Sequence, residues 1–162
     1  MRFINLALAG LVLTTPLHLA AQQAAPATAP ASAKVLVNVD RHGVGLAGFD
    51  PVAFFTDSAA VRGDSTHRAM YGGAIYWFAS EAHRALFQAD PAKYVPQFGG
   101  YCAYGASRGY AAKLEIDTWQ IINGRLTLNY NKDVQHTFNQ DVAGYLQKAN
   151  ANWAGIVERE GH

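Results

Sequence analysis

The dipeptide Asn123-Gly124 places the strongest constraint on what this chain can fold into, because it lies between the runs Trp-Gln-Ile-Ile and Arg-Leu-Thr-Leu. Asn-Gly favours the two successive positive-φ conformations of a type I′ turn, which joins antiparallel strands tightly. A two-residue turn here pairs Ile121 with Leu126 and predicts a β-hairpin. The apolar face expected for this hairpin consists of Trp119, Ile121, Leu126 and Leu128.

A second β-hairpin is predicted over residues 66–79, with Gly72-Gly73 as its turn. The pairs expected across this hairpin are Tyr71–Ala74, Met70–Ile75, Arg68–Trp77 and His67–Phe78. The second strand, residues 74–78, carries large apolar side chains on both faces, so we expect it to be buried on both sides.

The remaining regular segments predict helices. Ser80 is a favourable N-cap for a helix over residues 81–89, and Pro51 favours a short helical turn after Asp50. The inward face expected for the helix over 81–89 consists of Ala82, Ala85, Leu86 and Ala89. An amphipathic C-terminal helix, broken near Gly144, is predicted by the apolar series Val134, Phe138, Val142, Tyr145, Ala149 and Trp153. The fold class is therefore α+β: a small single domain with two β-hairpins and about three helices.

The N-terminal segment predicts an exported protein. Arg2 precedes a short apolar run at 6–13, and small residues precede Gln22, a pattern typical of a cleaved signal peptide over 1–21. An Ala/Pro-rich linker follows over 22–33. We expect the folded domain over 34–157, a tail over 158–162, and a periplasmic or secreted location. The apolar run is far shorter than the roughly 20 residues of a membrane span, so we expect no stable membrane insertion.

Composition excludes several classes of function. The 13 Lys and Arg residues barely exceed the 12 Asp and Glu residues, so no basic surplus supports a nucleic-acid partner. A single cysteine excludes an intramolecular disulfide and a multi-cysteine zinc site. The segment Gly-Ala-Ser-Arg-Gly at 105–109 matches the G-x-S-x-G pattern but lacks the buried parallel strand that this motif needs. We therefore do not predict catalytic turnover.

Several short motifs carry a resemblance to the YHS domain family. The runs Gly-Phe-Asp-Pro-Val-Ala-Phe-Phe at 48–55 and Tyr-Gly-Gly-Ala-Ile-Tyr-Trp-Phe-Ala-Ser at 71–80 resemble YHS domains, as do Phe87 and Asp-Pro-Ala-Lys-Tyr at 90–94. The exported bacterial branch of the family is resembled by Gly-Gly-Tyr-Cys-Ala at 99–103, Leu-Asn-Tyr at 128–130 and Asn152-Trp153. The similarity extends from about residue 34 to residue 153.

The resemblance implies a small metal-associated module with a treble-clef-like core, followed here by a C-terminal helix. Cysteine-bearing members of the family have thiols at the positions of Ala53, Ala79 and His83, so only His83 could still ligate a metal. The branch that this chain resembles carries its thiol at Cys102 instead. Some relatives have selenocysteine there, which implies a redox or soft-metal role for that position.

Cys102 is the main candidate for a functional residue, because it follows two glycines and precedes an expected helical turn. A helix N-terminus favours the thiolate, which is both the nucleophilic and the metal-binding form. With His67, His83 or His42 completing the ligand set, Cys102 would suit a copper or zinc ion. The tyrosines that could line a pocket around it are Tyr101, Tyr104 and Tyr110.

The leading interpretation is an exported soluble domain that binds a transition metal, copper or zinc, in the cell envelope. One alternative is a thiol-redox protein in which Cys102 forms a mixed disulfide or a sulfenic acid; lacking a second cysteine, it needs a partner thiol. Another alternative is a non-catalytic module that binds an envelope protein and buries an inert Cys102. The expected partners are thus a metal ion or an envelope protein.

Overall fold

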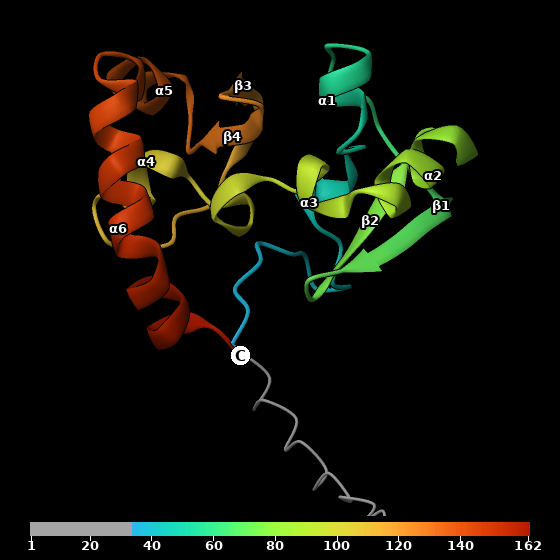
Figure 1. Cartoon of the computed structure of the whole chain (residues 1–162), viewed down its shortest axis with the longest axis horizontal. Helices are drawn as coiled ribbons and strands as arrows, with labels where there is room; N and C mark the ends of the chain where they lie inside the picture. The colour runs from blue at the N-terminus through green and yellow to red at the C-terminus, as the bar shows by residue number, and fades with distance from the viewer. Residues whose placement is uncertain (1–33) are drawn as a thin grey trace, which may run out of the picture. The chain divides into compact units, whose positions relative to one another are not determined.

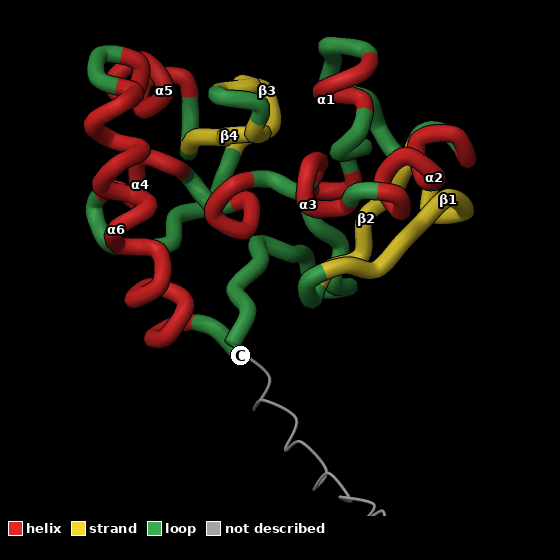
Figure 2. Tube along the Cα trace, viewed as in Figure 1, coloured by secondary structure: helices red, strands yellow, loops and turns green. Residues whose placement is uncertain are grey.

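The computed structural model describes residues 34–162, so the predicted signal peptide and linker lie outside the described residues. The elements are η1 (Leu46–Gly48), α1 (Ala53–Thr56), β1 (Asp64–Tyr71), β2 (Ala74–Phe78), α2 (Glu81–Ala89), α3 (Pro91–Tyr94), η2 (Gln97–Gly100), α4 (Ala103–Ser107), β3 (Glu115–Ile122), β4 (Arg125–Asn129), α5 (Lys132–Asn139) and α6 (Val142–Glu160). The strands form two separate antiparallel hairpins, β1–β2 and β3–β4 (Figures 1 and 2). The α+β class and both hairpins are confirmed. In the part that the structure describes, α2, α5 and α6 are the long helices, and α1, α3 and α4 add single turns.

The β3–β4 hairpin has the predicted turn. Asn123 and Gly124 both have positive φ, 51° and 73°, as a type I′ turn requires, and Ile121 pairs with Leu126. The register shifts further from the turn, so the predicted pairing of Trp119 with Leu128 does not form. Thr118 causes this shift: its hydroxyl accepts from the Asn129 amide at 2.8 Å and thereby takes the place of a backbone partner.

The β1–β2 hairpin pairs as predicted near its Gly-Gly turn, where Tyr71 faces Ala74 and Met70 faces Ile75. The predicted pairing of His67 with Phe78 is wrong, because Asp64 takes the position opposite Phe78 after a bulge. The Asp64 carboxylate accepts hydrogen bonds from the amide and the hydroxyl of Thr66, both at 2.8 Å, and this local turn interrupts the ladder. The expected burial of β2 on both faces is also wrong: Ala74, Tyr76 and Phe78 are buried, but Ile75 and Trp77 are only half-buried.

Helix α2 begins at the predicted N-cap, where the Ser80 hydroxyl accepts from the His83 amide at 3.2 Å. Its orientation differs from the prediction. The expected inward residues Ala82, Ala85, Leu86 and Ala89 are all exposed, and Phe87 is the buried anchor. The Phe87 ring packs against Tyr76 and Phe78, with centroid distances of 5.2 and 5.0 Å. One large ring removes more apolar area from water than the small alanine side chains, so Phe87 decides which face turns inward.

The C-terminal region contains the predicted broken helix. The break lies at Gln140–Asp141, and the Asp141 carboxylate caps α6 by accepting from the Gly144 amide at 2.9 Å. The predicted tail over 158–162 is wrong, because α6 continues to Glu160. Beyond it, His162 and Val35 exchange backbone hydrogen bonds of 3.0 and 3.1 Å, which ties this end to the start of the described chain. Among the described residues, no helix is both long and apolar enough to cross a bilayer.

Two apolar clusters organise the described residues. The first cluster packs the β1–β2 hairpin and α2 against α1 and β4, with Phe54, Phe78, Phe87 and Leu126 buried in it. The second cluster packs α4 and α5 against α6, around Ala103, Ala106, Phe138 and Ile156. Figure 1 shows α2 with its hairpin at one side and α4, α5 and α6 at the other. The segment that contains Cys102 leads from η2 into the second cluster.

Candidate functional site

Cys102 is held by the turn that joins η2 to α4. Gly99 and Gly100 have φ values of 56° and 75°, and a Cβ at Gly99 would collide with the backbone carbonyl of Leu36. The chain then leaves η2 in an extended conformation, and the Cys102 amide donates to the Ala112 carbonyl at 2.9 Å. Cys102 becomes the N-cap of α4, in agreement with the prediction that it precedes a short helix.

The Cys102 sulfur has polar partners although its side chain is buried. The Gly105 amide donates to Sγ at 3.3 Å, and the thiol faces the Asn129 carboxamide oxygen at 3.7 Å. The main-chain amides of Tyr104 and Tyr130 also lower the pKa of the Cys102 thiol, which favours the thiolate. The site therefore combines an acceptor for the thiol proton with amide dipoles that would stabilise a negative sulfur.

Burial nevertheless raises the pKa of the Cys102 thiol above its ordinary value, and the amide hydrogen bonds from Gly105, Tyr130 and Tyr104 oppose this effect only in part. Desolvation is the largest contribution because the residue is only 1% exposed. At neutral pH the resting group is therefore the protonated thiol. The expected activation of Cys102 by the helix N-terminus is outweighed by desolvation.

Asn129 fixes the geometry around this thiol. Its side-chain oxygen also accepts a hydrogen bond from the Tyr104 amide at 3.2 Å. The main-chain amide of Asn129 donates to the Thr118 hydroxyl, and this hydroxyl donates to the main-chain carbonyl of Asn129, both at 2.8 Å. Asn129 is fully buried, and its side-chain nitrogen has no hydrogen-bond partner among residues 34–162. The distortion of the β3–β4 ladder at Thr118 therefore also positions the group that faces Cys102.

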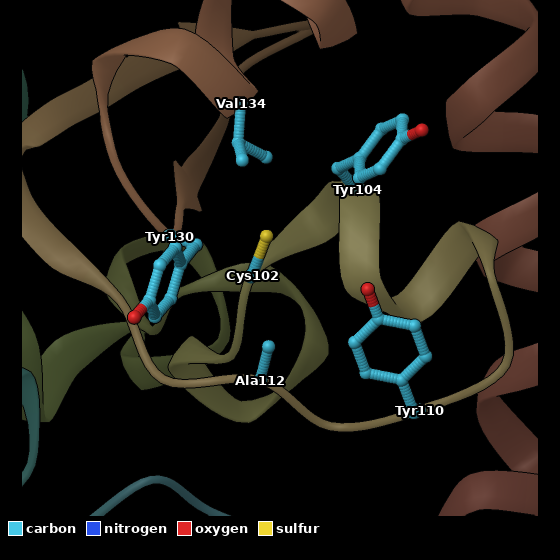
Figure 3. A pocket seen from close by; sticks show the side chains of 6 residues that line it. All are labelled: Cys102, Tyr104, Tyr110, Ala112, Tyr130 and Val134. Carbon is cyan, nitrogen blue, oxygen red and sulfur yellow. The ribbon is translucent and has the colours of Figure 1, made fainter.

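A cavity of about 260 Å³ opens above Cys102. Its lining consists of Cys102, Tyr104, Tyr110, Ala112, Tyr130 and Val134. Figure 3 shows the sulfur in the middle of this group, with the Tyr110 hydroxyl turned toward the cavity and the Tyr104 and Tyr130 hydroxyls turned away. Tyr110 and Tyr130 are 50% and 51% exposed, so their rings form a rim that solvent reaches. We call this site the Cys102 pocket.

Two of the three tyrosines expected near Cys102 are present. Tyr104 and Tyr110 line the pocket, whereas Tyr101 packs against Trp153 with a centroid distance of 6.3 Å. Tyr130, which was not among the expected residues, also lines the pocket. Sequence reasoning missed the contributions of Asn129 and Tyr130, although both lie in the Leu-Asn-Tyr segment that carried part of the resemblance.

The predicted histidine ligands lie apart from the Cys102 pocket, whose lining contains no histidine. His83 is on α2, where its Nδ1 lies 2.7 Å from an oxygen of the buried Asp50 carboxylate. His42 is exposed in a loop, with its Nε2 accepting from Arg41 at 2.9 Å. His67 is half-buried on β1, and its Nδ1 has no partner within the described chain.

The mixed cluster of Cys102 with two histidines is therefore not formed. Across residues 34–162, no group of three or more His, Cys, Asp or Glu side chains has an arrangement that could hold a metal ion. The physical reason is the division into two apolar clusters: α2 belongs to the first and α4 to the second, and Figure 1 shows them on different sides. Spacing along the sequence gave no indication of this separation.

Asp50 connects three segments of the fold through its carboxylate. As expected for a residue before proline, one carboxylate oxygen accepts from the Val52 amide at 2.8 Å at the start of α1. The other oxygen accepts from the Ala79 amide at 2.8 Å and faces the His83 ring. A carboxylate that bridges α1, β2 and α2 could not be recognised from the local Asp-Pro pattern.

Comparisons with protein-family models, with curated protein sequences and with solved structures gave no match for this chain. The fold and the site by themselves define a small α+β domain with one buried thiol at the base of a tyrosine-rimmed pocket.

Proposed function

We propose that this chain is a thiol-redox protein that acts through Cys102, which forms either a mixed disulfide or a sulfenic acid that a partner thiol then resolves. The observation that carries the proposal is the position of Sγ: it lies at the base of a cavity, faces an acceptor on Asn129 and receives the Gly105 amide. A buried thiol that served only packing would need neither a cavity beside it nor this set of polar partners.

The sulfur chemistry needs an oxidant, which we take to be a small hydroperoxide or a small disulfide. With a hydroperoxide, an S–O bond forms at Cys102 as the O–O bond breaks, and the thiol proton leaves with the alcohol. A partner thiol then attacks the sulfenic sulfur, an S–S bond forms, and water leaves. With a disulfide, the Cys102 thiolate attacks one sulfur and the other leaves as a thiolate. The amides around Sγ would stabilise the anionic sulfur in both routes.

The raised pKa of the Cys102 thiol limits how fast the proposed reaction can proceed at neutral pH. Few Cys102 side chains are thiolates at neutral pH, and the buried residue lines the Cys102 pocket, through which a small reagent would reach the sulfur. Reaction is therefore slow in the resting protein and selective for molecules that fit between Tyr104, Tyr110 and Tyr130. A thiol that reacts slowly is compatible with an oxidising compartment, because an exposed reactive thiol would be oxidised there by many different molecules.

We further propose that the chain is an exported member of the YHS domain family that works in the periplasm or outside the cell. The motifs at 48–55, 71–80 and 99–103 support the family, and the Arg2-led apolar run supports export. Copper or zinc binding through Cys102 remains the alternative function. A single thiolate supplies one soft ligand, so such a site would need further ligands from a second molecule.

Trapping of the oxidised thiol tests the proposal. The full chain is incubated with hydrogen peroxide plus dimedone, and separately with oxidised glutathione, and each product is measured by intact mass. We expect one adduct on the native protein and none on Cys102→Ser. Tyr130→Trp is the matched pocket variant: it keeps the sulfur and its bonds but narrows the entrance, so it should slow both reactions.

Three results would overturn the proposal. A thiol that reacts only after denaturation would make Cys102 an inert core residue and favour a protein-binding module. Near-stoichiometric copper or zinc that survives dialysis and is lost in Cys102→Ser, without any thiol adduct in the wild type, would favour a metal-binding protein. Equal reaction rates of the wild type and Tyr130→Trp would show that the pocket does not control access.

A further inference from the structure

We infer that the Cys102 pocket selects an organic hydroperoxide that carries one aromatic ring, or an alkyl group of similar size, over hydrogen peroxide and over a charged disulfide. This inference rests on the proposed thiol-redox function and names the substrate class of that same site. It also assigns the Tyr110 hydroxyl as the hydrogen-bond donor to the reacting peroxide.

The size of the cavity suits one ring beside the reacting oxygens. An apolar cavity of about 150 Å³ accommodates a benzene molecule, and the space above Cys102 measures about 260 Å³. The additional volume has room for the peroxide group and the carbon that bears it. Hydrogen peroxide has only two heavy atoms, and a single water occupies about 30 Å³ of the liquid, so it would leave most of this space unfilled.

The walls of the cavity are aromatic and aliphatic. The side chains that surround the sulfur in Figure 3 are Tyr104, Tyr110, Tyr130, Ala112 and Val134. Aromatic walls attract a ligand ring through edge and face contacts in addition to its burial. None of the lining residues carries a charge, so the carboxylates of oxidised glutathione would lose hydration there without gaining a cationic partner.

Packing and hydrogen bonds hold three of these walls in place without a ligand. The Tyr104 ring packs edge-on against Tyr145, with centroids 5.1 Å apart. The Ala112 carbonyl accepts from the amide of the reactive cysteine at 2.9 Å. The Val134 amide donates to the Asn131 side chain, also at 2.9 Å, in the cap of α5. Binding of a ring therefore does not have to order these walls, which favours affinity for a ligand of matching shape.

The two rim tyrosines differ in where their hydroxyls point. Tyr110 and Tyr130 are almost equally exposed, at 50% and 51%, but Figure 3 shows only the Tyr110 hydroxyl turned toward the cavity. Gly105 permits this position, because a Cβ there would lie only 3.3 Å from Cε2 of Tyr110. A phenol hydroxyl can donate a hydrogen bond, so Tyr110 is placed to donate to a peroxide oxygen that lies over Sγ.

The proposed step is oxidation of the sulfur by the bound hydroperoxide. The Cys102 thiolate attacks the terminal peroxide oxygen, an S–O bond forms as the O–O bond breaks, and the electron pair leaves on the oxygen bonded to carbon. The Tyr110 hydroxyl stabilises the negative charge that develops on this oxygen. The oxygen takes up one proton, equal to the one that the thiol released, so the hydroperoxide is reduced to an alcohol and the sulfur is oxidised to a sulfenic acid. The partner thiol then resolves the sulfenic acid.

Oxidation of the full chain by cumene hydroperoxide and by hydrogen peroxide tests the inference, with the loss of free thiol followed by intact mass and Cys102→Ser as the blank. The rate with cumene hydroperoxide is divided by the rate with hydrogen peroxide, and the same ratio is measured on the chain unfolded in guanidinium. We expect the native ratio to exceed the unfolded ratio by about tenfold or more, because only the folded pocket buries the ring. Relative to the unfolded chain, oxidised glutathione should be the slowest of the three oxidants.

The role of the Tyr110 hydroxyl is tested by Tyr110→Phe, which keeps the ring. This variant should slow oxidation by cumene hydroperoxide about three- to tenfold more than Tyr130→Phe does. The effect should be specific to the peroxide, because the sulfinate that leaves methyl methanethiosulfonate needs no proton, so the rate with this reagent should not fall in parallel. Tyr71→Phe, an exposed tyrosine outside the pocket, is the control and should behave as the wild type.

Failure of this inference and failure of the proposed function give different results. If both peroxides oxidise the unfolded chain but neither oxidises native Cys102, the thiol-redox function is wrong and the inference falls with it. If native Cys102 is oxidised but the native and unfolded ratios are equal, the substrate class is wrong and the thiol-redox function stands. Equal losses of rate in Tyr110→Phe and Tyr130→Phe would overturn the role of the Tyr110 hydroxyl. Should a variant fail to fold, the ratio measured on the wild type still decides the substrate class.

Discussion

The pH dependence of Cys102 reactivity gives a sharp test of the pocket. The perturbation is a change of pH from about 7 to about 9, applied to the native protein and to the same chain unfolded in guanidinium. An unfolded cysteine has a pKa near 8.5, so about 3% of it is thiolate at pH 7 and its reaction rate levels off above about pH 8.5. Burial raises the pKa of the native Cys102 thiol, so its thiolate fraction is smaller throughout this range.

The expected magnitude follows from the titration curve. Well below its pKa, a thiol becomes about tenfold more ionised for each pH unit, so the native rate should still be rising at pH 9, where the unfolded rate has begun to level off. The side chain is only 1% exposed and opens onto a cavity of about 260 Å³. A small reagent such as methyl methanethiosulfonate should therefore react far faster than a bulky aromatic disulfide.

The assay is the loss of free thiol, followed by mass spectrometry at several pH values, with Cys102→Ser as the blank. The same pKa shift has a consequence for stability. Because the folded pKa lies above the unfolded one, the contribution of Cys102 to stability is complete below about pH 8.5 and is lost as pH rises through the folded pKa. A native rate that levels off below pH 8, or that exceeds the unfolded rate at pH 7, would refute the reasoning about burial.

Three further predictions concern the fold that supports the site. Phe87→Ala should lower the free energy of unfolding by about 3–5 kcal/mol, whereas Leu86→Ala on the exposed face should change it by about 0.5 kcal/mol or less; urea melts that give equal losses would contradict the observed orientation of α2. Burial raises the pKa of Tyr76 to about 12, so the stabilisation from its neutral phenol, about 2–3 kcal/mol, is complete below pH 10 and is lost between pH 10 and about 12. Tyr76→Phe should remove that part of the alkaline destabilisation, and identical alkaline melting curves for both proteins would contradict it. Asn129→Ala leaves the Tyr104 amide without its acceptor and should cost about 1–3 kcal/mol while increasing the thiol labelling rate, which the mass assay would measure.

Local chemistry explains why the elements of the fold were predictable. Asn123-Gly124 specifies its turn through backbone conformations that these residues adopt readily, and Ser80 specifies a helix start through one side-chain hydrogen bond. Both signals act within a few residues, so they do not depend on contacts with distant parts of the chain. The predicted break near Gly144, found at Gln140–Asp141, and the helical turn after Cys102 are of the same kind.

The contacts that assemble the sites act over much longer separations. Asp50 meets His83 across 33 residues, and Asn129 meets Cys102 across 27. Such pairs depend on how each helix is rotated, and Phe87 turns α2 so that the alanines point outward and His83 points toward Asp50. The spacing of the apolar residues on α2 could not reveal this rotation, because a helix with several small apolar residues offers more than one face that can be buried.

The sequence by itself thus determined the α+β class, the two hairpin turns, the Ser80 N-cap of α2 and the position of the thiol before α4. Only the tertiary structure decided that Cys102 lies in a tyrosine-rimmed pocket without histidines and that His83 faces Asp50, Thr56 and Asp57. The reason is physical: turns and caps are stabilised by neighbours in the chain, whereas these sites form where the two apolar clusters pack distant segments together.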